Sequence, residues 1–80
     1  LKIHSKTINL YTVESNISKQ LSLIQKKYKK FVDIGSYPFF RMGKIGVSIV
    51  SRSTSLTKLN KVQSDLIKLA ELKNIKILKI

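Results

Sequence analysis

The chain has no cysteine and no tryptophan, one histidine, one proline and four acidic residues among its 80 residues. The absence of cysteine excludes disulfide bonds and thiolate metal sites, and it favours an intracellular, cytoplasmic location. His4 has no cysteine or acidic residue at metal-ligand spacing. We therefore expect a solvated histidine near the terminus rather than a metal site.

Long apolar runs are also missing. No run approaches the roughly 20 residues of a membrane span, and no signal peptide is visible. The predicted helices lack the Trp and Phe anchors that interfacial helices usually carry, so we expect no membrane partner. Because Leu1 is not an initiator methionine, we expect residues 1–80 to be a single small α+β domain from a longer protein.

The few acidic residues argue against catalysis. The four carboxylates are Glu14, Asp33, Asp65 and Glu71. Asp65 and Glu71 are six positions apart on a predicted helix, which does not place them on one face. The serines have no matching histidine and acid. We expect neither catalysis by this chain alone nor a cofactor.

Basic residues are abundant: sixteen Lys and Arg give a net charge of +12. This balance favours an anionic partner such as nucleic acid. However, fourteen of the sixteen are Lys, which commonly serves only to solvate a surface. The hypothesis of a small nucleic-acid-binding module would use phosphate contacts from Lys26, Lys27, Lys29, Lys30, Arg41, Lys44 and Arg52.

The first half of the chain predicts a strand and a helix. Alternation over residues 6–13 predicts a strand with Ile8 and Leu10 on one face. Capping side chains at residues 14–16 then favour a helix start. One apolar stripe follows at helical spacing, made by Ile17, Leu21, Ile24 and Tyr28.

The segment 32–52 predicts a strand, a turn and a second strand. Val32 and Ile34 share one face of a strand over residues 31–37, and Pro38 is expected to end its ladder. Residues 39–43 are expected to turn the chain. The inner face of the next, antiparallel strand would carry Ile45, Val47 and Ile49.

A second helix and a short strand complete the pattern. Ser53, Thr54 and Ser55 all qualify as the N-cap, and Asn74 suits the helix end. The helical stripe comprises Leu56, Leu59, Val62, Leu66, Leu69 and Ala70, and the last strand would use Ile75, Ile77 and Ile80.

This order predicts a ferredoxin-like split β-α-β-β-α-β fold, with one antiparallel sheet and both helices on one face. The other sheet face would be open. We expect Tyr11, Val50 and either Phe31 or Tyr37 to lie on it.

The predicted turn has an unusual composition. Phe39, Phe40 and Met42 are apolar, and Arg41 and Lys44 flank them. Large apolar side chains at a loop tip are unfavourable unless something covers them. We interpret these five residues as an interaction loop. In the alternative, both rings fold back over the sheet end.

Two known nucleic-acid-binding motifs can be compared with this part of the sequence. Gly43 and Gly46 match the GxxG of KH domains, but that loop joins two helices, so we interpret these residues as turn glycines. RNA-recognition motifs stack bases on aromatics of the first and third strands. Here the first strand offers only Tyr11 and the third none, so base stacking on the sheet is not predicted.

Four short segments carry a family resemblance: Thr12-Val13-Glu14-Ser15 followed by Ile17 and Leu21, Val32-Asp33-Ile34-Gly35-Ser36-Tyr37-Pro38, Val47-Ser48-Ile49-Val50-Ser51-Arg52, and the helix from Ser55. Together they resemble the CinA family. Similar modules follow the molybdopterin-binding-like domain in FAD synthetase relatives. The high Lys content and Phe39-Phe40-Arg41 depart from the family pattern.

The resemblance implies an accessory, KH-like α+β module beside a MoaB-like domain that handles a nucleotide or a pterin. The partner implied is that domain or a second copy of the chain, with domain packing or oligomerisation as the role. Some relatives also carry a nicotinamide-nucleotide amidase domain, and the MoaB-like part is linked to ADP-ribose hydrolysis. The implied parent is thus a nucleotide hydrolase or an amidase, and none of that chemistry maps onto these residues.

Overall fold

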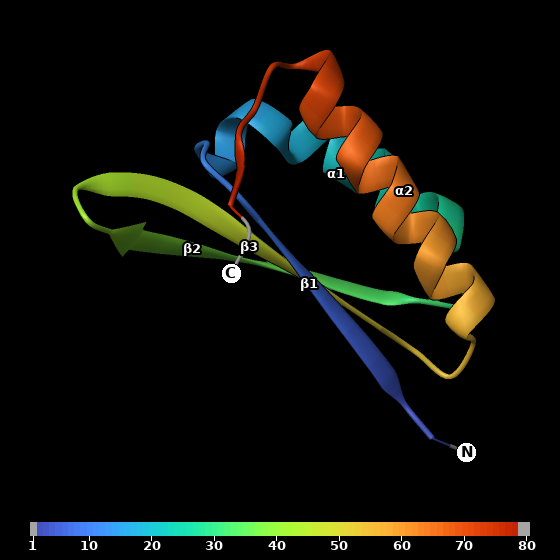
Figure 1. Ribbon diagram of the computed structural model, residues 1–80. Coiled ribbons are helices and arrows are strands. Elements are labelled where there is room, and N and C mark those ends of the chain that lie inside the picture. The colour runs from blue at the N-terminus through green and yellow to red at the C-terminus, as the bar shows by residue number, and fades with distance from the viewer. Residues whose placement is uncertain (1, 79–80) are drawn as a thin grey trace.

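The computed structural model describes residues 2–78. Its elements run in the order β1 (His4–Leu10), α1 (Glu14–Tyr28), β2 (Asp33–Arg41), β3 (Lys44–Ser53), α2 (Leu56–Leu72) and β4 (Ile77–Leu78). The sheet order is β2-β3-β1-β4, and all neighbouring strands are antiparallel. Both helices lie on the same face of the sheet (Figure 1). The predicted ferredoxin-like fold is confirmed.

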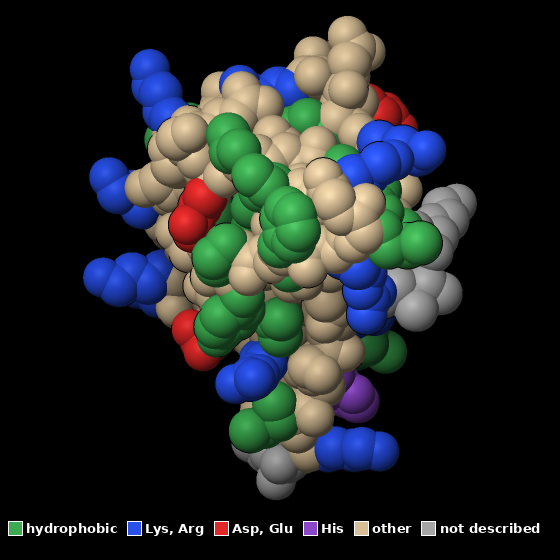
Figure 2. Space-filling view, turned by 90° about the vertical axis from the view of Figure 1, so that its left-hand side faces the viewer, with side chains coloured by type: hydrophobic (Ala, Val, Ile, Leu, Met, Phe, Trp, Pro, Cys, Tyr) green, Lys and Arg blue, Asp and Glu red, His purple; other side chains and the backbone are tan. Residues whose placement is uncertain are grey.

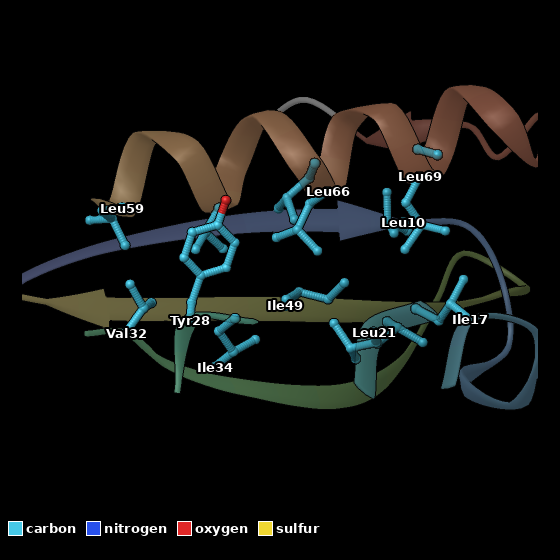
Figure 3. Packing of buried hydrophobic residues seen from close by; sticks show 14 residues of the cluster. Leu10, Ile17, Leu21, Tyr28, Val32, Ile34, Ile49, Leu59, Leu66 and Leu69 are labelled. Carbon is cyan, nitrogen blue, oxygen red and sulfur yellow. The ribbon is translucent and has the colours of Figure 1, made fainter. Parts of the chain in front are cut away.

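One apolar core fills the space between the helices and the sheet (Figure 3). The helical stripes lie inside it as predicted, except that Ile24 is only partly buried and Leu56 is about half exposed. Opposite them, the sheet contributes Ile8, Leu10, Ile34, Val47 and Ile49, and Val32 joins the core from just before β2. The alternation of buried and exposed residues therefore fixes which sheet face the helices cover.

The helix ends agree only in part with the predicted caps. The N-cap of α1 is Val13, which makes no side-chain cap bond, so the predicted capping role of residues 14–16 is wrong. The side chain of Asn16 instead donates to Thr12 Oγ1 at 2.9 Å. Ser55 does cap α2 by accepting from the backbone N–H of Lys58, and Asn74 has the predicted left-handed conformation.

The largest departure from the predicted structure is the β2–β3 connection. β2 continues to Arg41, so Phe39 and Phe40 are strand residues and not turn residues. Pro38 stands opposite Val47 and does not end the ladder, because β2 is an edge strand where a missing N–H is tolerated. Only Met42 and Gly43 lie between the strands.

The remaining strand predictions differ at their ends. Ile45 is 54% exposed, not internal, because the hairpin extends past the helices (Figure 1). β1 covers residues 4–10, so residues 11–13 lead into α1. The predicted last strand is reduced to β4, with Ile75 packed on the core and Ile80 outside the described residues. Neither of the two described helices is long and apolar enough to cross a membrane.

Candidate interaction site on the β2–β3 hairpin

The hairpin that carries the predicted interaction residues is long and tightly closed. β2 and β3 have 9 and 10 residues, and they pair in register as far as Arg41 and Lys44. The two connecting residues, Met42 and Gly43, have φ values of 53° and 76°. This is the geometry of a two-residue primed turn, whose twist matches that of paired strands. The tip is therefore an ordered ladder and not a loop.

Phe39 and Phe40 lie on opposite faces of this ladder. Successive strand residues alternate in direction, so the two rings separate. Phe39 is partly buried on the open sheet face, above Gly46 of β3. Phe40 points to the other face and is 73% exposed. Folding back over the sheet thus holds for Phe39 but not for Phe40.

Three exposed apolar side chains, which we call the apolar tip, occupy the end of the hairpin. Phe40 stands opposite Ile45 in the ladder, and Met42 lies in the adjoining turn with 93% exposure. In the view from the side of the turn, hydrophobic side chains gather near the centre, and Lys, Arg and acidic side chains lie beside them and around the outline (Figure 2). Such a grouping is typical of a surface that contacts a partner.

A second group, which we call the aromatic face, lies on the open side of the sheet. The rings of Tyr11 and Phe39 meet edge to face, with centroids 6.5 Å apart. Lys44 Nζ is 5.2 Å from the Tyr11 ring centroid. Tyr37 precedes Phe39 by two positions on the same face, and its ring folds over Gly35.

Of the residues predicted for this face, which are Tyr11, Val50 and either Phe31 or Tyr37, the strand positions of Val50 and Tyr37 agree. Tyr11 follows β1 directly and meets Phe39 on this face. Phe39 is not among the predicted residues, because Pro38 is expected to end the second strand. The usable signal was the alternation of Gly35, Tyr37 and Phe39 through the proline. Phe31 is not on the face, since it precedes β2 and its ring lies 4.7 Å from Lys58 Nζ of α2.

The seven basic residues predicted to bind anions do not form one patch. Arg41 and Lys44 flank the hairpin turn, whereas Arg52 stands opposite Asp33 at the other end of the sheet. Lys44 and Arg52 are eight positions apart along β3, a distance of about 26 Å at about 3.3 Å per residue. Near Arg52, Lys29 and Lys30 line a hollow of ≈ 610 Å³ together with Asp33.

Lys27 is less available to bind an anion, because it already pairs with Asp65. Its Nζ lies 3.4 Å from Asp65 Oδ2, and the same oxygen accepts a hydrogen bond from the Tyr28 hydroxyl at 2.8 Å. The Asp65 charge raises the pKa of Lys27, and burial followed by the hydrogen bond to Asp65 raises the pKa of Tyr28. This triad joins α1 to α2. Its role is structural.

The acidic residues are dispersed. Glu14 accepts a hydrogen bond from Ser36 at 2.6 Å, and Asp33 lies at the start of β2. Asp65 pairs with Tyr28 and Lys27 in the triad. Over residues 2–78, no three His, Asp or Glu side chains gather as metal ligands would.

The sequence model of one protein family, described as FAD synthase, middle domain, matches residues 2–78. This agrees with the part of the resemblance that pointed to modules in FAD synthetase relatives. No curated protein matches the chain.

Proposed function

Because the chain belongs to the FAD synthase middle-domain family, we propose that it is a non-catalytic accessory domain of a nucleotide-handling protein, docked through its apolar tip. The family match spans nearly the whole chain, so the accessory role applies to the entire domain. The finer proposal is a parent of the CinA or MoaB-like type, in which the tip packs on the MoaB-like domain. The cysteine-free composition supports a cytoplasmic protein.

The observation that carries the proposal is the exposure of Phe40, Met42 and Ile45 on one ordered hairpin end. Covering each such side chain would contribute about 1.5–3 kcal/mol. Little of this gain would be lost to ordering the backbone, because the ladder is already formed up to Arg41 and Lys44.

The charges around the apolar tip indicate which kind of partner surface would fit it. Arg41 and Lys44 flank the turn, and Asp33, the only acid of β2 and β3, lies at their far end. An apolar centre with a charged rim is the usual anatomy of a protein interface. The complementary surface is a shallow apolar pocket bordered by Asp or Glu. A membrane surface fits less well, since only three apolar side chains are available.

The test compares two surface variants. Phe40→Ser with Met42→Ser removes the centre of the tip, whereas Leu72→Ser removes an 84% exposed apolar side chain of α2 and serves as the control. The full-length protein that contains this domain is subjected to limited proteolysis between its domains. We expect the tip variant to increase the cleavage rate and the control to leave it unchanged.

Light scattering over a range of concentrations reports whether a second copy covers the tip instead. A dimer that the tip variant dissociates and Leu72→Ser does not would assign the tip to self-association. If neither the cleavage rate nor the molar mass responds to the tip variant, the docking proposal is wrong.

A further inference from the structure

The aromatic face is a second surface that the docking role leaves unused. Both helices cover the opposite side of the sheet (Figure 1), and the face is made by Tyr11, Tyr37 and Phe39. Tyr37 is 54% exposed, and the other two rings are partly exposed. These three rings are not part of the core, so core packing does not explain why aromatic residues occur on this uncovered face of the sheet.

Glycines hold two of these rings close to the sheet. A Cβ at Gly46 would lie only 2.7 Å from both Cε atoms of Phe39 and closer still to Cζ. A Cβ at Gly35 would lie 3.0 Å from the Tyr37 hydroxyl and 3.2 Å from its ring. The rings thus rest on backbone that carries no side chain. Tyr37 is nevertheless 54% exposed and Phe39 is partly exposed, so both rings keep accessible surface on which a base could stack.

A small hollow with a polar floor adjoins Phe39. It measures ≈ 180 Å³ and is lined by Phe39, Phe40, Arg41, Leu78, Asn9 and Ser48. The Ser48 hydroxyl donates to Asn9 Oδ1, which orients the amide. Within residues 2–78 the Asn9 amide nitrogen makes no side-chain hydrogen bond. A fixed donor beside an aromatic ring suits the edge of a nucleobase.

We propose that the aromatic face binds single-stranded nucleic acid, with a base stacked on Phe39 and its edge at Asn9. Arg41 and Lys44 lie at the adjacent end of the sheet and would contact phosphates. The chain's net charge of +12 favours a polyanion. Bases in a duplex are paired and stacked, so their ring faces and edges are not free for this contact, whereas a single strand presents them.

The size of the hollow argues against a complete small-molecule ligand. Pockets that enclose such ligands typically measure about 300–1,000 Å³, well above this one. The hollow suits one ring edge, and the remaining contacts spread over an open surface. Such an arrangement fits successive nucleotides of a strand, in which Tyr37 and Phe39 each meet a different base.

The experiment measures fluorescence anisotropy with labelled oligonucleotides of single composition (dT, dA and dC) and with a duplex of the same length. Phe39→Leu keeps Gly46 covered but removes the aromatic ring, and Tyr37→Leu removes the exposed ring. Phe31→Leu is the matched control, because Phe31 is 53% exposed but lies against Lys58 of α2, away from the aromatic face. We expect about 5-fold or more loss of single-strand affinity for each variant of the face and none for the control.

Salt and base identity provide independent readouts. Affinity should fall as salt rises from about 50 to about 200 mM, because phosphate contacts release counterions. Asn9→Ala should reduce the preference among dT, dA and dC, an effect that a folding defect would not mimic. Urea unfolding verifies that each variant folds, and Phe39→Tyr should retain binding.

Three results would overturn the proposal. They are no binding to any single strand at low salt, equal binding of duplex and single strand that Phe39→Leu and Tyr37→Leu leave unchanged, and binding that a free mononucleotide displaces as well as the oligonucleotide does. The second result would mean that binding depends on charge alone, and the third that the face binds a small ligand. None of them bears on docking through the apolar tip, which uses Phe40.

Discussion

The ring of Phe39 lies directly over Gly46, its partner across the β2–β3 ladder. Glycine weakens a strand unless its missing side chain is useful. Here it leaves space for an aromatic ring to lie on the sheet, and the ring in turn covers the backbone of Gly46, which is buried. The pair joins the hairpin to Tyr11 at the end of β1, because Phe39 also meets that ring.

Gly46→Ala should therefore destabilise the domain by about 1–3 kcal/mol, because the new methyl group displaces Phe39 and strains the ladder. The measurement is the free energy of unfolding in urea. Gly35→Ala is the matched control, since there the nearest atom is the hydroxyl of an exposed tyrosine that can move away. We expect its effect to be close to zero.

A double-mutant cycle isolates the contact. In a Phe39→Ala background the ring is gone, so Gly46→Ala should lose most of its cost. An equal cost in both backgrounds would show that the ring is not the reason for the glycine.

Replacing Met42 should change stability and docking in opposite directions. Its φ of 53° is unfavourable for a non-glycine residue, and its side chain is 93% exposed. Asn tolerates this conformation, and Asn-Gly is the preferred pair for this turn. Met42→Asn should raise the unfolding free energy by up to about 1 kcal/mol.

The same variant should weaken docking in the full-length protein, because it removes one third of the apolar tip. Gly43→Ala provides the opposite control: with φ at +76° it should destabilise the turn while leaving the tip intact. A Met42→Asn protein that is both less stable and fully docked would contradict both assignments.

The fold could be predicted because a regular spacing of hydrophobic residues recurs in several helices and strands of the chain. The stripes of Leu59, Val62 and Leu66 and of Ile17 and Leu21 determine two helices and the sheet face that they cover. The alternation of Val47 and Ile49 determines the register of a central strand. An error at one element end does not change such a pattern.

The candidate site was less predictable because it depends on strand order and on single positions. Pro38 normally indicates the end of a strand, and only the place of β2 at the sheet edge allows the ladder to continue. The separation of Phe39 from Phe40 follows from that continuation. The spread of Arg41 and Arg52 to opposite ends also needs the strand pairing, because composition reports total charge and not its location.

Two buried serines on the core face of β3 should respond with opposite sign to the same substitution. Ser51 is fully buried, and its hydroxyl has no hydrogen-bond partner among the described residues. Ser51→Ala removes this unsatisfied group and should stabilise the domain by about 1 kcal/mol. Ser53 donates to the carbonyl of Phe31 at 2.6 Å and accepts from the N–H of Ser55 at 3.0 Å.

Ser53→Ala should therefore destabilise the domain by about 1–3 kcal/mol, because it leaves two partly buried backbone groups without partners. Urea unfolding of both variants under one set of conditions gives the comparison. If Ser51→Ala is the more damaging of the two, the inner face of β3 is packed differently from the structure described above.

Stability should decline at alkaline pH through the triad that joins the helices. Burial and the bond to Asp65 raise the pKa of Tyr28 above its ordinary value of 10.0, and the Asp65 charge raises that of Lys27 above 10.5. A raised pKa in the folded state means stabilisation that is complete below the unfolded value and lost as pH rises through the folded value. The loss should therefore begin near pH 10.

Tyr28→Phe separates the hydrogen bond from its titration. At neutral pH the variant should lose about 1.5–3 kcal/mol, the usual contribution of a hydrogen bond to a charged group. Above pH 10 its melting temperature should fall less steeply than that of the wild type, since no buried phenol remains to ionise. A wild-type melting temperature that falls no more steeply than that of Tyr28→Phe would mean that the hydroxyl of Tyr28, at 2.8 Å from Asp65, does not couple α1 to α2.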